Sequence, residues 1–379
     1  MQIEYREAGS DFNYVHMLHY IMAKVMVGLS GGVDSSVTAY LLKQRGYEVE
    51  GVSLILYEAR NRSSQAICCS IEAQDSAPET AAALGIKHRS VDVRNAFIDA
   101  VVDPFVESYK NGMTPNPCIL CNKHIKFPYL LSAADEAGAE FIATGHYARV
   151  ERKQGAEGNE HRVTLRRGID SKKDQSYVLY RLSREQIERL LLPLGDLTKD
   201  DVRQIARSLN LPAAERPESQ EICFVEGNDY NAFIEQLAPE SVRPGLIVNA
   251  DGKTVGTHKG VYAYTIGQRK GLNIASLDPH FVTQIDPLSN SIRVGLRDEA
   301  MSQRIRVREM NWLVRPEPSS FSALVKVRSM MEARSASIQA GEDACDLVFD
   351  EPQWAPAPGQ SAVFYDGDVV IGGGIISRE

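Results

Sequence analysis

The sequence lacks two features that would direct a protein to a membrane or out of the cell. A bilayer span requires roughly 20 consecutive apolar residues, and no stretch of this 379-residue chain approaches that length. The first 21 residues carry Glu4, Arg6, Glu7 and Asp11 where a secretory signal would have an apolar core. We therefore expect a cytoplasmic protein with no membrane partner, in which the six cysteines are reduced thiols.

The chain also lacks an excess of positive charge. Its 42 Lys and Arg residues are outnumbered by 50 Asp and Glu residues, which gives a formal net charge of −8. This balance argues against bulk nonspecific binding to nucleic acid, but it is compatible with a local basic face. One basic cluster, Arg166-Arg167 with Lys172-Lys173, would suit a phosphate backbone, although a solvated loop explains it equally well.

A glycine turn near the N-terminus matches neither the Walker A loop, whose lysine is missing, nor the dinucleotide fingerprint. A strand predicted over Lys24–Leu29 ends in Ser30-Gly31-Gly32-Val33-Asp34-Ser35, and a helix is predicted over Ser36–Arg45. Adjacent glycines let backbone amides approach an oxyanion, and the helix directs the positive end of its dipole at the same point. The turn therefore predicts a phosphate or pyrophosphate pocket. Asp34 within it predicts a bridging Mg²⁺, since an unbridged carboxylate would repel the ligand.

From Met22 onward, predicted strands and helices alternate, which is typical of an α/β fold with a parallel sheet covered on both faces. The predicted strands are Lys24–Leu29, Glu48–Tyr57, His88–Val93 and Glu140–Thr144. The predicted helices are Ser36–Arg45, Ile71–Leu84, Ala96–Lys110 and Asn122–Ala137. Ligands bind at the carboxyl ends of such strands. We therefore expect the glycine turn, Leu54 and Gly145-His146-Tyr147 to share one pocket.

The second half of the chain changes to short strands. A hairpin is predicted over Tyr147–Arg166, followed by short helices at Ser183–Leu191 and Lys199–Leu209, the latter capped by Thr198. The strands of a predicted β-barrel are Ile305–Val307, Ser322–Arg328, Ser335–Gln339, Cys345–Phe349, Ser361–Tyr365 and Val369–Ile375. The predicted parts are an extension that we expect to be disordered (1–21), a catalytic domain (22–222), a small central domain (223–303) and the barrel (304–379).

Two cysteines, Cys118 and Cys121, precede the helix predicted to start near Asn122. A helix N-terminus and nearby cations lower the pKa of a thiol, which favours Cys121 as a nucleophile. No second Cys/His pair at zinc-finger spacing is evident, but Cys118 and Cys121 with Cys223 are candidates for a three-thiolate iron–sulfur site. Cys345 is interpreted as a buried apolar residue.

Several strings beyond the glycine turn carry a resemblance to a known family. They are TPNPCILCNKHIKF (114–127), ATGHYAR (143–149), DQSYVLY (174–180), LGDLT (194–198), SQEICF (219–224), YTIGQRKG (264–271) and PGQSAVFYDGDVVIGGG (358–374). With them the chain resembles, from about Met22 to its end, the tRNA-specific 2-thiouridylases of the PP-loop ATP pyrophosphatase superfamily. The resemblance implies an adenine nucleotide alpha hydrolase-like PP-loop domain, a small mixed central domain and a C-terminal β-barrel.

The resemblance implies a tRNA-uridine 2-sulfurtransferase. ATP would adenylate the C2 oxygen of the wobble uridine, a cysteine persulfide would deliver sulfur, and AMP and pyrophosphate would be released. This order makes chemical sense, because AMP is a good leaving group and a bare carbonyl oxygen is a poor one. The implied cofactors are ATP and Mg²⁺, and the implied partners are tRNA and a protein that donates persulfide sulfur. We expect a monomer, and a disulfide bond is among the features of the family.

The family's functional residues map onto this chain by motif. Those implied to bind ATP are Gly28, Leu29, Ser30, Gly31, Gly32, Val33, Asp34, Ser35, Leu54 and Gly145. Cys121 matches the nucleophile, and Cys223 matches the cysteine that carries the persulfide. Those implied to contact tRNA are Asn116, Pro117, Cys118, His146, Lys173, Asp174, Gln175, Arg328, Ser329 and Gln360.

The chain departs from the family at three positions. Many members have Asp at the position of Cys118, methionine at that of Leu54 and an aromatic residue at that of Ser329. The third thiol leaves open a version in which a [4Fe–4S] cluster, ligated by Cys118, Cys121 and Cys223, holds the sulfur.

Two other functions compete with thiolation. One is another PP-loop adenylating, RNA-modifying ligase, such as an amidotransferase; the missing glutaminase domain and the cysteine pair argue against it. The other is an RNA-binding protein with an inactive nucleotide site, and the intact Ser-Gly-Gly-x-Asp-Ser turn argues against that.

Overall fold

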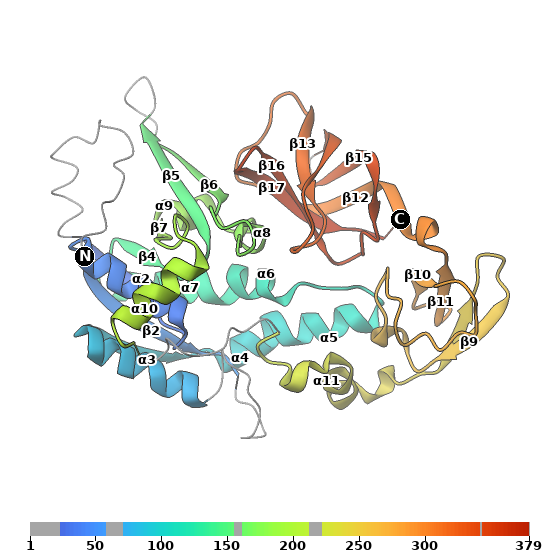
Figure 1. The fold of residues 1–379 in the computed structure, drawn as a ribbon, viewed down its shortest axis with the longest axis horizontal. Coiled ribbons are helices and arrows are strands. Elements are labelled where there is room, and N and C mark those ends of the chain that lie inside the picture. Colours follow the sequence, from blue (N-terminus) through green and yellow to red (C-terminus); the bar gives the residue numbers. More distant parts are fainter. Residues whose placement is uncertain (1–22, 58–70, 155–160, 212–221, 342, 379) are drawn as a thin grey trace.

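The structure is a computed structural model that describes residues 23–57, 71–154, 161–211, 222–341 and 343–378 (Figure 1). The predicted N-terminal extension and the Cys68-Cys69 pair lie outside the described residues. Within the described residues, no helix has the length and apolar character needed to cross a bilayer.

A five-stranded parallel sheet with the order β3-β2-β1-β4-β7 forms the centre of the catalytic domain. Its strands are β1 (Lys24–Gly28), β2 (Glu48–Ile55), β3 (Lys87–Asp92), β4 (Phe141–Ala143) and β7 (Leu190–Leu191). Val25, Met26 and Val27 are fully buried because helices cover both faces of the sheet. The predicted parallel sheet is confirmed. One prediction is wrong: the helix expected over Ser183–Leu191 ends at Glu188, and Leu190–Leu191 is a strand.

Successive residues of β1 contact helices on opposite faces of the sheet. Met26 packs against the helix at Phe127–Glu136, whereas Val25 and Val27 pack against the helices on the other face. The catalytic-domain helices are α2 (Val33–Gln44), α3 (Ile71–Leu84), α4 (Arg94–Phe97), α5 (Asp103–Lys110), α6 (Pro117–Cys121), α7 (Phe127–Glu136), α8 (Ser176–Leu179), α9 (Arg184–Glu188) and α10 (Lys199–Ser208). Two π-helical turns replace parts of the helices predicted from the sequence: η1 (Ile98–Val102) interrupts the predicted helix Ala96–Lys110, and η2 (Asn122–Lys126) forms the start of the predicted helix Asn122–Ala137.

The central domain is a four-stranded mixed sheet beside a helix. Its strands, in the sheet order β10-β11-β8-β9, are β10 (Phe281–Asp286), β11 (Ser291–Gly295), β8 (Gly245–Val248) and β9 (Thr254–His258). Its helical segments are η3 (Glu226–Asn228), α11 (Tyr230–Leu237), η4 (Pro239–Ser241), η5 (Val261–Ala263) and η6 (Arg297–Ala300). Ile247 and Val282 of this sheet share one hydrophobic core with Phe105 of α5, so helix α5 joins the catalytic and central domains.

The C-terminal domain is a closed barrel of six antiparallel strands. They are β12 (Met301–Trp312), β13 (Ser320–Lys326), β14 (Arg334–Ala340), β15 (Ala344–Trp354), β16 (Ser361–Asp366) and β17 (Val369–Ile376). Strand β12 is long enough to pair with both β15 and β17, which closes the barrel. All six predicted strands are confirmed.

The predicted hairpin has an attachment that the sequence did not indicate. Its strands β5 (Ala148–Gln154) and β6 (His161–Arg167) extend the barrel sheet, because Arg166 pairs with Val369 of β17. In Figure 1 the hairpin rises from the catalytic domain beside the barrel. Arg149 and Arg166 secure the contact through ion pairs of 2.6 and 2.7 Å with Asp368. The catalytic domain and the barrel are thus hydrogen-bonded into one sheet.

Candidate active site

The glycine turn lies between β1 and α2, as predicted. Gly31 has a φ of 74°, a left-handed conformation that favours glycine. Gly32 is the N-cap of α2 and provides no capping side chain. An N-terminus without a cap, at the carboxyl end of a parallel strand, is a suitable position for an anion.

The serines of the turn stabilise its backbone. The Ser35 hydroxyl donates to the Gly32 carbonyl at 3.0 Å and accepts from the Ser30 amide at 3.2 Å. Ser36 also donates to Gly32 at 3.0 Å, and Ser76 from α3 donates to Gly31 at 2.7 Å. The turn is therefore held in shape before any ligand binds.

The carboxylate of Asp34 is already paired. Lys199 Nζ donates to its two oxygens at 2.6 and 2.8 Å, and the Tyr147 hydroxyl donates to Oδ1 at 2.7 Å. Among the residues that the structure describes, no three His, Cys, Asp or Glu side chains are grouped to hold a metal. Asp34 would suit Mg²⁺ in the mode where one carboxylate and the phosphates of the substrate share the ion.

The loop after β4 packs against the first turn of α2. A Cβ on Gly145 would lie 2.8 Å from the carbonyl carbon of Asp34 and 2.9 Å from the amide nitrogen of Ser35, so this approach requires glycine. The next residue, His146, shares a hydrogen bond of 2.8 Å with Thr144 and stacks on Phe127. Burial, with the charge of Lys126, lowers the pKa of His146 to about 3, which keeps the ring neutral.

Leu54 lies on the strand beside the glycine turn. Gly28 pairs with Val52 in the β1–β2 register, so Leu54 is two residues further along β2 in the direction of the turn. Its half-buried side chain packs against the hydrophobic core that contains Cys121. The expected meeting of the glycine turn, Leu54 and Gly145 at one edge of the sheet agrees with these positions.

Helix α6 starts earlier than the sequence suggested. The helix was predicted to start near Asn122, but Asn116 caps it by accepting from the Cys118 amide at 3.1 Å, and Pro117 occupies the first helical position. Proline is favoured there because its missing N–H would have no helical partner. Cys118 therefore lies in the first turn of α6, and Cys121 is its fifth and last residue, after which the helical backbone continues into η2.

The three cysteines of interest occupy different environments. Cys118 is exposed, Cys121 is buried, and half-buried Cys223 packs against the same core as Cys121. Cys118 and Cys345 are free thiols. Cys345 is buried in the barrel, as predicted, and burial raises its pKa to about 11.

The arrangement of the cysteines does not favour an iron–sulfur cluster. Within the described part of the chain, no three or more His, Cys, Asp or Glu side chains are grouped so that they could hold a metal ion. Cys118, Cys121 and Cys223 therefore do not form such a group. The residues thus do not fit the cluster version, and we derive no step through it.

The predicted tRNA contacts are largely engaged in contacts within the protein. Asp174 accepts hydrogen bonds from the amides of Gly168 and Ser176 at 3.1 Å, and Gln175 exchanges two with the backbone of Tyr147 at 2.8 and 2.9 Å. Arg328 Nη2 donates to the carbonyls of residues 266 and 355 at 2.9 and 2.8 Å. These hydrogen bonds stabilise the segments that carry the predicted tRNA-contacting residues.

Three domains meet at Thr114, just before the capped helix α6. Its amide donates to the Pro358 carbonyl at 2.8 Å, and its own carbonyl accepts from Gln360 Nε2 at 2.8 Å, so the barrel holds both sides of the residue. Its hydroxyl is 3.2 Å from that of Thr265 in the central domain. The segment with Asn116, Pro117 and Cys118 is therefore positioned by all three domains.

The basic cluster is only partly available to a ligand. Arg166 pairs with Glu151 and Asp368 at 2.9 and 2.7 Å, and the Arg167 guanidinium lies 3.9 Å from the centre of the Tyr365 ring. Lys172 is exposed on its loop. The arginines of the cluster serve the junction with the barrel.

Lys199 is a residue of the candidate site that sequence reasoning did not identify. Tyr147 was expected to share the pocket of the glycine turn, and its hydrogen bond to Asp34 agrees with that expectation. Lys199 carried one signal: it is the first residue of α10, where a cation opposes the helix dipole. The confirmed N-cap, Thr198, marks that position, but nothing in the sequence pointed from it to Asp34.

Three family models match successive parts of the chain. They are described as "tRNA methyl transferase HUP domain" for residues 23–227, "tRNA methyl transferase PRC-barrel domain" for residues 231–296 and "Aminomethyltransferase beta-barrel domain" for residues 302–376.

Relatives that match along almost the whole chain identify the family more specifically than the domain models do. The chain is 44% identical to tRNA-specific 2-thiouridylase MnmA 1 of Caldanaerobacter subterraneus subsp. tengcongensis, over 94% of this chain and 98% of that protein. It is 42% identical to MnmA of Clostridioides difficile, over 95% and 99% of the two chains. It is 44% identical to MnmA of Carboxydothermus hydrogenoformans, over 94% and 98%. Since these relatives match along nearly their whole length, the chain belongs to the tRNA-specific 2-thiouridylase family, as its motifs predicted.

Proposed function

We propose that this chain is the sulfurtransferase that converts the wobble uridine of tRNA to 2-thiouridine, using ATP and a cysteine persulfide. In the first step the uridine O2 attacks the α-phosphorus of ATP. An O2–phosphorus bond forms, the bond to the bridging oxygen breaks, and pyrophosphate leaves. The glycine turn supports this step, because its uncapped helix N-terminus suits the leaving anion.

In the second step Cys223, loaded by a sulfur-donor protein, carries the persulfide. Its terminal sulfur attacks C2 of the activated uridine, and AMP leaves with the original oxygen. The Cys121 thiolate then attacks the inner sulfur, which frees 2-thiouridine and leaves a disulfide between Cys121 and Cys223. An external thiol reductant restores the two thiols.

One observation carries the proposal: Cys121 and Cys223, distant in sequence, pack on a single core that Leu54 also contacts. The predicted nucleotide side and the predicted sulfur side therefore border the same hydrophobic core. The core around Phe224 is strongly aromatic, with Phe97 and Phe105 at ring distances of 5.6 and 5.3 Å. An apolar wall of this kind would keep water away from the adenylated uridine.

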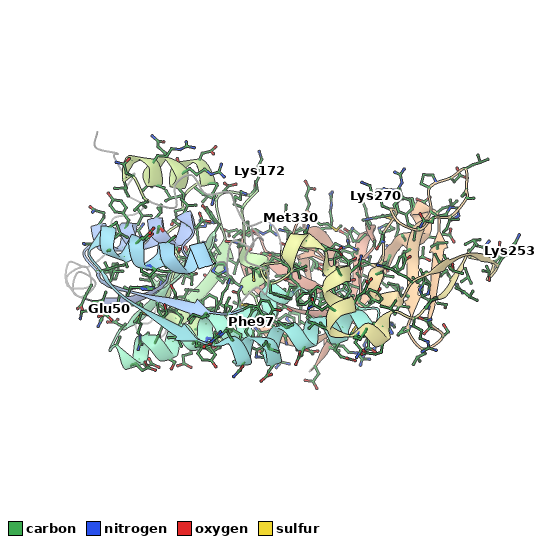
Figure 2. The ribbon with its side chains drawn as sticks, turned by 90° about the horizontal axis from the view of Figure 1, so that it is seen from below. Glu50, Phe97, Lys172, Lys253, Lys270 and Met330 are labelled. Atoms are coloured by element: carbon green, nitrogen blue, oxygen red, sulfur yellow. The ribbon has the colours of Figure 1, made fainter. Side chains whose placement is uncertain are left out.

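The substrate surface proposed for tRNA spans the domains. Figure 2 shows Lys172, Met330 and Lys270, which come from the catalytic domain, the barrel and the central domain, along the same upper edge of the molecule. All three side chains are exposed, and the two lysines suit phosphate contacts. The exposed edge is compatible with a local basic face on a chain of net negative charge.

The test is a reconstituted reaction with purified protein, unmodified tRNA, ATP, Mg²⁺ and a persulfide donor. We expect 2-thiouridine in the nuclease digest by mass spectrometry, and no product with Cys121→Ser. Cys345→Ala, which removes a thiol from the barrel core, is the matched control and should retain product formation. An unchanged yield in Cys121→Ser would refute the role of that residue, and the absence of 2-thiouridine with the folded parent protein would refute thiolation itself.

A further inference from the structure

Lys199 occupies a position that is unfavourable for an ordinary surface lysine. It is the first residue of α10, at the positive end of the helix dipole, and only 9% of its side chain is exposed. Burying an ammonium is costly unless it is paired. A lysine in this position therefore needs a specific partner.

That partner belongs to the glycine turn. Lys199 Nζ bonds both oxygens of Asp34 at 2.6 and 2.8 Å and lies 5.5 Å from the centre of the Tyr147 ring. Its backbone amide is fixed by Asp170 Oδ2 at 3.0 Å. The ammonium is thus held at the N-terminus of α2, beside the anion position.

Helices α2 and α10 also contact each other through apolar side chains. Val33 and Val37 of α2 already pack against Val202 and Ala206 of α10 in a compact hydrophobic core. The charge at Asp34, in contrast, opposes a polyanion, because like charges held close together in a partly buried site repel each other. Cancelling this charge is the specific contribution of Lys199.

We propose that Lys199 is a polyphosphate-binding residue of this site. Its ammonium neutralises Asp34 while the turn is empty and moves to the incoming phosphates when the nucleotide binds. This inference rests on the proposed use of ATP at the glycine turn. It predicts that removing the carboxylate and removing the ammonium have opposite effects on phosphate binding.

Calorimetric titration with inorganic pyrophosphate, in EDTA and then in Mg²⁺, tests the inference. Lys199→Met should weaken binding about tenfold or more in both buffers, since Asp34 is left uncompensated. Asp34→Asn should strengthen binding in EDTA, because the ammonium is released to the ligand. The double variant should lose that gain. If Asp34→Asn does not strengthen binding in EDTA, or if the double variant keeps the gain, the lysine is only a helix tether and the inference is wrong.

Two controls separate the possible failures. Lys253→Met removes an exposed lysine at the far tip of the central domain (Figure 2) and should leave pyrophosphate binding unchanged. Thermal unfolding shows whether each variant is folded. Lys199→Arg, which keeps a positive charge, should bind pyrophosphate more tightly than Lys199→Met does. If the parent protein binds neither pyrophosphate nor ATP, the proposed function fails; if the parent binds and Lys199→Met binds equally well, only the role of Lys199 fails.

Discussion

Gly145→Ala tests the contact between the β4 loop and the glycine turn. The added Cβ would lie 2.8 Å from the carbonyl carbon of Asp34, whereas ordinary contacts of such an atom begin at 3.4 Å. The first turn of α2 must therefore retreat by the difference, 0.6 Å. Overpacking of this kind costs about 1–3 kcal/mol, which lowers the unfolding temperature of a domain of this size by roughly 2–10 °C. Because the displaced atoms include the amide of Ser35, ATP binding should weaken as well.

The assays for this variant are differential scanning fluorimetry and ATP titration. Gly256→Ala in β9 is the matched control for stability, because its Cβ would find no atom nearer than 3.7 Å. The unfolding temperature of the control should stay close to that of the parent. If Gly145→Ala has the parental unfolding temperature and ATP affinity, the close approach at Gly145 does not position the turn, and the reasoning is refuted.

The remaining predictions concern sulfur transfer, pH, the domain junction and metal content. Cys223→Ser should abolish thiolation while ATP titration remains unchanged, since the residue acts only in the second step. The depressed pKa of His146, about 3 against an ordinary 6.5, means that the unfolded chain binds more protons between these values. Stability should therefore fall as pH drops below 6.5, and urea unfolding of His146→Asn should show a weaker decline; an equal decline would contradict the assignment. Gln360→Ala removes the bond to the Thr114 carbonyl, worth about 1 kcal/mol, and should lower the thiolation rate, whereas Gln339→Ala on the exposed barrel face should not. Anaerobically purified protein should be colourless, iron-free and active, and stoichiometric iron with activity that is lost on its removal would revive the cluster version.

The sequence predicted the repetitive parts of the fold well. Strand β1 and the barrel strands were predictable because apolar runs and alternation report directly on burial. Short features were missed for local reasons: two-residue β7 has no pattern of its own, and the start of α6 depended on the Asn116 cap and a proline that favours the first helical position. The boundaries at 222 and 303 stay a prediction.

The parts of the candidate site that lie within one short stretch of sequence were predictable. The glycine turn is such a string, and its conformation follows from Gly31 and the helix start. Lys199 was not predictable, because its partner Asp34 is 165 residues away and only the folded chain brings them together. The attachment of the β5–β6 hairpin to the barrel was not predictable either, because the paired residues Arg166 and Val369 are far apart in the sequence. The assigned roles of Cys121 and Cys223 remain proposals.

The junction at Thr114 limits how this architecture can be recombined. A domain that is merely tethered can be exchanged between relatives as a module. Here the barrel holds the amide and the carbonyl of one residue of the catalytic domain, and the central domain contacts its hydroxyl. A chimera with a foreign barrel would therefore have to retain the Pro358–Gln360 segment. Without it, the loop before the cysteines would lose the hydrogen bonds that position it. At this point the three domains depend on one another structurally.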